Sequence, residues 1–121
     1  MEVAHGPDLP QFTTKDGSSV RELAHPRSSA AAALSVAEAV VAAGAQTDEH
    51  LHRSSEEVYI FISGRGRMRL GAEEAEVQAG DAVVIPAGTP HKLWAADSGP
   101  LVLLCACCPP YSDEDTVLTG G

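Results

Sequence analysis

The chain has 121 residues, which suits a single domain with one core, and apolar residues make up 44% of it. Lysine and arginine total 8 against 17 aspartates and glutamates, so the net charge is −9. This balance repels phosphate groups, and we therefore expect neither nucleic acid nor an anionic membrane as a partner. Aromatic residues account for only 4% of the chain, so a core must be built mainly from Ala, Val and Leu.

The first part of the chain is polar. Residues 1–28 are rich in Pro, Gly, Ser and Thr, and we interpret them as an N-terminal arm with at most one short strand around Val20 to Leu23. His5 and His25 lie in this arm and are expected to be solvated. No cationic segment followed by an apolar one occurs here, so a cytoplasmic localisation is expected.

Residues 30–45 are compatible with two structures. Alanine favours a helix, but the stretch "LSVAEAV" alternates apolar and polar residues as a strand does. The segment is too short and too polar to cross a bilayer. Sequence alone leaves helix and strand open here.

The middle of the chain indicates an all-β fold. "VYIFISG", "GRMRLG", "AEVQAG", "AVVIPAG", "HKLWAA" and "LVLLCACC" follow one another at short spacing, separated by Gly and Pro. Such a series predicts a sandwich or barrel over residues 29–108, followed by a polar C-terminal tail, 109–121. The one basic cluster, "GRGRMR" at 64–69, is typical of a solvent-facing strand.

Candidate metal ligands lie at the start of this region. His50 and His52 are two residues apart, so on a strand both imidazoles point to the same side. A turn at "RSSE" can bring the carboxylate of Glu57, or that of Glu56 if the strand begins one residue earlier, beside them. His91 follows two tight turns that fix its position. Imidazole nitrogen with carboxylate oxygen suits a divalent transition metal.

These residues also fall into two spaced motifs, and on them the sequence resembles the cupins. The first cupin motif, glycine, His-x-His, glutamate and glycine, matches Gly44, His50, His52, Glu57 and Gly64, and its spacing selects Glu57 over Glu56. The second motif matches Gly80, Pro86, Gly88 and His91, but has Ala95 where asparagine is usual. The resemblance covers roughly residues 30–108.

The resemblance implies a small antiparallel jelly-roll barrel that holds one divalent metal through His50, His52, Glu57 and His91. It also implies a homodimer and a small-molecule ligand or substrate. Six metals are compatible with nitrogen and oxygen ligands of this kind, and the sequence does not choose among Fe, Mn, Ni, Co, Cu and Zn.

Strand parity predicts what surrounds the metal. Tyr59 and Phe61 share the face of Glu57, Leu93 and Ala95 share that of His91, and Lys92 and Trp94 point the other way. Tyr59 is a candidate proton donor or a packing residue, and Glu57 can leave the metal to take a proton. Cys105 and Cys107 share one face beside Cys108, as small buried residues or as redox-active thiols.

Two functions follow from this interpretation. The first is a metal-dependent enzyme acting on a small, largely apolar substrate with a carbonyl, enol or carboxylate. Dioxygenase or isomerase chemistry is favoured over decarboxylase or lyase chemistry. The alternative is a non-catalytic cupin, in which the metal anchors a ligand or stabilises a structural or sensory dimer.

Overall fold

The computed structural model describes residues 1–121, and its regular structure is almost entirely β-strand. A single 3-10 turn, η1 (Gly6–Asp8), precedes the strands. The strands are β1 (Phe12–Thr13), β2 (Ser19–Ala24), β3 (Ser35–Val41), β4 (His50–His52), β5 (Glu56–Ser63), β6 (Arg65–Leu70), β7 (Glu73–Gln78), β8 (Ala82–Ile85), β9 (His91–Ala95), β10 (Leu101–Cys108) and β11 (Thr116–Leu118). None of the helical segments has the length and hydropathy that crossing a bilayer requires.

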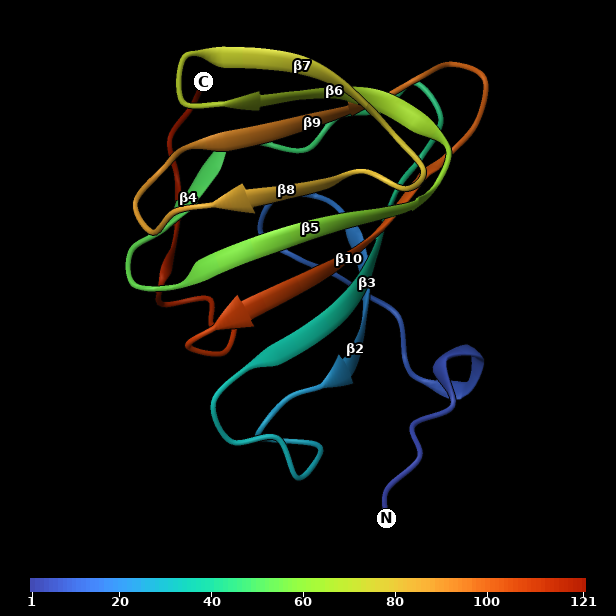
Figure 1. Ribbon diagram of the computed structural model, residues 1–121, viewed down its shortest axis with the longest axis vertical. Coiled ribbons are helices and arrows are strands. Elements are labelled where there is room, and N and C mark those ends of the chain that lie inside the picture. The colour runs from blue at the N-terminus through green and yellow to red at the C-terminus, as the bar shows by residue number, and fades with distance from the viewer.

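The strands form two antiparallel sheets that face each other as a jelly-roll barrel (Figure 1). The six-stranded sheet has the order β1-β2-β3-β10-β5-β8, and the five-stranded sheet has the order β11-β4-β9-β6-β7. The predicted all-β jelly roll is therefore confirmed. The core between the sheets contains Phe61, Ile85, Leu101 and Leu103, each at most 1% exposed.

The ambiguous alanine-rich segment is a strand, β3. It lies between β2 and β10, so its backbone is paired on both sides. Ala37 and Ala39 face the interior of the barrel, where their small side chains leave space for a cavity. Tertiary pairing thus overrides the helix preference of alanine.

Both ends of the chain contribute more structure than an arm and a tail. Strand β2 lies where one short strand was expected and pairs with β3, and its Val20 joins the core. The two-residue strand β1 is additional and forms a hairpin with β2. At the other end, β11 pairs with β4, the strand of His50 and His52. Both termini are therefore joined to the sheets around the candidate site.

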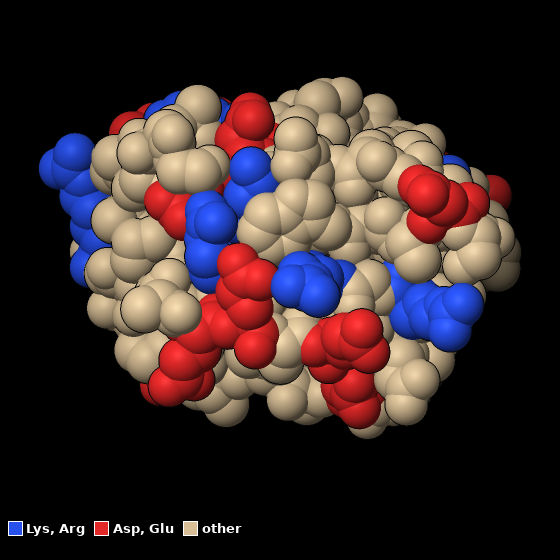
Figure 2. Space-filling model, turned by 90° about the horizontal axis from the view of Figure 1, so that it is seen from above, with Lys and Arg blue, Asp and Glu red and all other residues tan.

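The basic cluster at 64–69 forms β6, whose arginines alternate with the buried Met68. Strand β7 lies beside it, and its glutamates meet these arginines in register; the Arg67 and Glu74 side chains are 2.9 Å apart. In the view onto this side of the barrel, acidic and basic side chains are mixed (Figure 2).

Two glycines at the β5–β6 connection lie directly against neighbouring backbone. A Cβ atom at Gly66 would overlap the backbone carbonyl of Trp94 on β9, its neighbour in the same sheet, and one at Gly64 would overlap that of Pro100. Gly64 also has a φ of +82°, which favours glycine. Glycine is required here because the backbones approach too closely for a side chain.

Candidate metal centre

Three strands deliver four buried polar side chains to one point in the barrel. Strand β4 provides His50 and His52, β5 provides Glu57 near its start, and β9 provides His91 directly opposite His50. All four residues are at most 4% exposed. The strand period of two explains why both histidines of "HLH" point inward. Glu56, the competing acid, is exposed.

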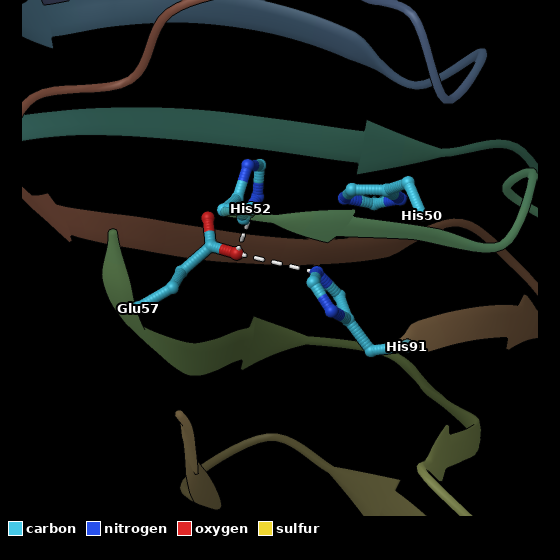
Figure 3. Close-up of side chains that lie close together, drawn as sticks. All are labelled: His50, His52, Glu57 and His91. Carbon is cyan, nitrogen blue, oxygen red and sulfur yellow. Dashed lines mark ion pairs between the residues drawn. The ribbon is translucent and has the colours of Figure 1, made fainter. Parts of the chain in front are cut away.

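The four side chains converge closely enough to share one ion. One ligand atom from each lies within 4.8 Å of the others. Glu57 Oε1 is 3.1 Å from His52 Nε2 and 3.3 Å from His91 Nε2, as the dashed lines of Figure 3 show. Two atoms bound to one metal at about 2.1 Å are about 3 Å apart when the angle at the metal is near 90°. The observed separations match that spacing.

The outer nitrogens of the three rings fix their tautomers. His50 Nδ1 lies 3.0 Å from the Asp48 carbonyl, and His91 Nδ1 lies 2.9 Å from the Thr89 carbonyl. A carbonyl only accepts hydrogen bonds, so each Nδ1 carries a proton and each Nε2 presents a lone pair to the centre.

The third ring is fixed by the C-terminal strand. His52 Nδ1 lies 3.0 Å from the Thr116 hydroxyl, which in turn donates to the Ser112 carbonyl at 2.8 Å. Since the Thr116 proton is already used, its oxygen must accept from His52 Nδ1. All three imidazoles are therefore held in the same tautomer.

Three acceptor atoms at the centre of the cluster have no hydrogen-bond partner in the protein. Glu57 Oε1, His52 Nε2 and His91 Nε2 are all buried and receive no hydrogen bond from the protein. Burying such acceptors without a partner is costly. A proton could join only one nitrogen to the carboxylate, whereas one metal ion would satisfy every ligand atom. The donor set and its orphaned atoms thus fit a divalent transition metal.

Glu57 is held as a carboxylate. Burial raises the pKa of Glu57, but positive charge shared with His52 and His91 outweighs this and lowers the pKa to about 2. A metal held between the three groups would supply that positive charge in place of protons. Its second oxygen, Oε2, accepts a hydrogen bond from Cys107 Sγ at 3.1 Å. Burial lowers the pKa of His50, which keeps that ring neutral. Neutral nitrogens and one anionic oxygen are the forms in which these groups bind metals.

A cavity opens beside the cluster, between the two sheets. Its volume is about 50 Å³. Tyr59, Leu93 and Leu103 line it, together with the alanines of β3. The Tyr59 ring lies edge-on to the His91 ring, with 5.6 Å between centroids. Burial raises the pKa of the Tyr59 phenol well above its ordinary value, so the hydroxyl keeps its proton.

Most of the side-chain directions expected from parity are found. Tyr59 and Phe61 are buried on the Glu57 face, and Leu93 and Ala95 are buried on that of His91. Cys105 and Cys107 both line the cavity, whereas Cys108 is exposed. Burial raises the pKa of the Cys105 and Cys107 thiols, so both are protonated.

The opposite side of β9 also agrees with the expectation. Trp94 points away from the cavity, and the charged ends of Lys92 and Arg69 lie 5.3 and 5.4 Å from its ring centre. These cations therefore pack on the outside of the barrel.

One expectation is wrong, and two residues of the site were missed. His25 is not solvated: it is 6% exposed, and its Nε2 lies 2.9 Å from the Tyr111 carbonyl. His5 is exposed as expected.

Thr116 and Asp16, which approach the histidines, come from segments interpreted as a tail and an arm. Their only sequence signal is local: "TTKDGSS" and "SDEDT" are turn-forming stretches that bring polar side chains to fixed places.

Together, the antiparallel jelly-roll barrel and the buried cluster of three histidines and one glutamate define a single-domain β-barrel protein with a candidate metal centre. The sequence profile of the cupin domain matches residues 37–107. The chain belongs to the cupin family, as its two motifs indicated.

Sequence and structure comparisons agree with this assignment. The uncharacterised protein MJ1618 of Methanocaldococcus jannaschii is 48% identical over 105 residues, which are 87% of this chain and 84% of that protein. Pac13, a nucleoside dehydratase of Streptomyces, superposes with a TM-score of 0.80 at 17% identity, covering 99% of this chain and 92% of Pac13. An oxalate decarboxylase of Lactobacillus farciminis gives a TM-score of 0.80 at 23% identity, covering 94% of this chain and 34% of the larger protein. At these identities the two structures support the fold.

Proposed function

We propose that His50, His52, Glu57 and His91 bind one divalent transition metal, and that the protein is a metal-dependent enzyme acting on a small organic molecule. The observation that carries this proposal is the group of buried, unpartnered acceptor atoms at the centre of the cluster. Hydrogen bonds to the Nδ1 atoms set the tautomers of the three histidine rings, an arrangement typical of metal-binding histidines.

The residues around the cluster suit chemistry on a substrate oxygen. When bound, the metal would supply positive charge that polarises a carbonyl or stabilises an enolate, or would bind O₂. Tyr59 presents a protonated hydroxyl to the cavity and is the proposed proton donor. The apolar walls formed by Leu93, Leu103 and the alanines of β3 would limit the water around the substrate.

Dioxygenase or isomerase chemistry remains our favoured proposal. Two enzymes of the same fold, a nucleoside dehydratase and an oxalate decarboxylase, show that such barrels support different reactions on small molecules. The metal's identity would rank these chemistries, since iron favours O₂ activation and zinc favours polarisation.

The experiment is metal analysis by mass spectrometry on protein purified without a histidine tag. We expect about one metal ion per chain in the wild type and a large loss in His52→Ala and His91→Ala. The matched control is His5→Ala, which removes an exposed histidine and should keep the full metal content. A double variant of His52 and His91 that still retained one metal per chain would refute the proposed ligand set.

A non-catalytic binding role is the second candidate. It is favoured by Tyr59, whose pKa is raised by burial and neighbouring negative charge and is influenced by no hydrogen bond, so no side chain relays a proton to its hydroxyl. Tyr59→Phe separates the two functions. In an enzyme it lowers turnover of an identified substrate by a factor of about 10²–10⁴, whereas in a binding protein it changes only ligand affinity.

A further inference from the structure

The cavity receives a carboxylate from the N-terminal hairpin. Asp16 lies at the tip between β1 and β2, and its side chain, only 11% exposed, lines the cavity beside His50. Asp16 Oδ1 accepts hydrogen bonds from the Thr14 hydroxyl and from both the backbone amide and the hydroxyl of Ser18. The other oxygen, Oδ2, accepts none of these hydrogen bonds and lies 3.7 Å from His50 Nδ1.

The hairpin tip that carries Asp16 is fixed to the rest of the barrel. The Asp48 amide donates to the Asp16 carbonyl at 2.7 Å, just before β4. The ammonium group of Lys15 donates to the carbonyls of Asp113 and Thr116 at 2.8 and 2.9 Å, which joins the tip to the C-terminal segment. Oδ2 is therefore held in a defined place, as recognition of a ligand requires.

The cavity contains no cationic side chain. Its walls carry Asp16, Glu22 and Glu57, and neither lysine nor arginine is among the residues that line it. Glu22 is paired with Arg27, 3.5 Å away, and Glu57 belongs to the metal cluster. Asp16 is thus the one lining carboxylate with neither a cationic side chain nor a metal to balance it. An anionic ligand would meet this charge within a chain of net charge −9.

We propose that Asp16 Oδ2 is a ligand-recognition site, and that the cavity takes a small uncharged molecule with a hydroxyl or amide N–H group. One end of the molecule would face the metal cluster through an oxygen, and the hydroxyl or amide N–H at the other end would donate a hydrogen bond to Asp16. This inference rests on the proposed metal site and narrows its substrate class from carbonyl, enol or carboxylate compounds to uncharged ones.

The test uses glycolamide and glycolate, which have the same number of non-hydrogen atoms and differ in an amide replacing the carboxylate. Binding of each to zinc-loaded, ¹⁵N-labelled protein is followed by NMR, with the Ser18 amide as a local reporter. Replacing Asp16 by Asn removes the charge and turns an acceptor into a donor. We expect the ratio of the glycolate Kd to the glycolamide Kd to fall at least about tenfold in Asp16→Asn.

Asp8→Asn is the matched control, because Asp8 is an exposed acid and the substitution changes the net charge equally. It should leave the ratio unchanged. A second measurement needs no variant: compared with aqueous zinc, the wild-type protein should shift the preference from glycolate toward glycolamide. An unchanged ratio in Asp16→Asn, no such shift in the wild type, or no binding of glycolamide would overturn the inference. Protein that binds no zinc at all would instead refute the metal site itself.

Discussion

Thr116→Val tests whether the C-terminal strand β11 supports the proposed metal centre. Valine has nearly the shape of threonine but cannot accept the proton of His52 Nδ1, which lies 3.0 Å from the Thr116 hydroxyl. His52 is 3% exposed, so water cannot readily replace the lost partner. The substitution also removes the donor to the Ser112 carbonyl.

Two effects of Thr116→Val can be given a magnitude. A buried donor left without a partner costs about 1–3 kcal/mol, which should appear as a lower free energy of unfolding of the metal-free protein. Loss of the hydrogen bond that orients a metal-binding histidine reduces metal affinity by about 10–100-fold. Denaturant titration measures the first effect, and competition with a chromophoric chelator measures the second.

Two further variants isolate the hydroxyl. Thr116→Ser keeps an acceptor for His52 and should recover most of the metal affinity. Thr13→Val makes the same chemical change at an exposed position on β1, and should behave as wild type. If Thr116→Val bound metal as tightly as the wild type, the argument that this hydrogen bond orients His52 would be wrong.

Three other predictions concern stability. Gly66→Ala should lower the free energy of unfolding by about 3 kcal/mol, because its Cβ would overlap the Trp94 carbonyl. Its control, Gly99→Ala, adds a methyl group in open space and should change the free energy of unfolding by less than about 0.5 kcal/mol. Tyr59→Phe should change the free energy of unfolding by less than about 1 kcal/mol, because the hydroxyl has no hydrogen-bond partner in the protein; denaturant titration measures all three variants. Although partial burial raises the pKa of Asp115, hydrogen bonds from the 54–55 segment lower it overall, so its stabilising effect is present above about pH 4 and is lost as pH falls through the folded-state pKa. Between about pH 6 and 3, the free energy of unfolding should therefore decrease less in Asp115→Asn than in the wild type. The difference between the two decreases should equal the pH-dependent contribution of the Asp115 carboxylate.

The part of the site within the two motifs could be predicted from the sequence, because it depends on strand parity and fixed turns. His50 and His52 point inward together because they are two residues apart on one strand. The same period places Tyr59 beside Glu57. A tight turn ahead of His91 fixes where β9 begins and so places that histidine. Strand parity and turns are local properties, which can be inferred from the spacing of residues along the chain.

The contributions of Asp16 and Thr116 could not be predicted in this way. Each lies in a short polar segment without apolar alternation, so neither periodicity nor composition indicates a strand. Their positions come from pairing with residues far away in the sequence, such as Thr116 with His52. The same reason explains His25, whose partner, the Tyr111 carbonyl, is 86 residues distant. Long-range pairing of this kind is set by the folded barrel.

The pairing of β11 with β4 has a consequence for the order in which the site matures during synthesis. By the time His91 has been made, all four proposed ligands exist, but the strand that fixes His52 does not. The ribosome produces the chain from the N-terminus, so this histidine acquires its orientation only after residue 116 has emerged. The proposed metal would therefore be bound tightly only after β11 has been translated. Partly synthesised chains would then compete poorly with finished ones for that metal.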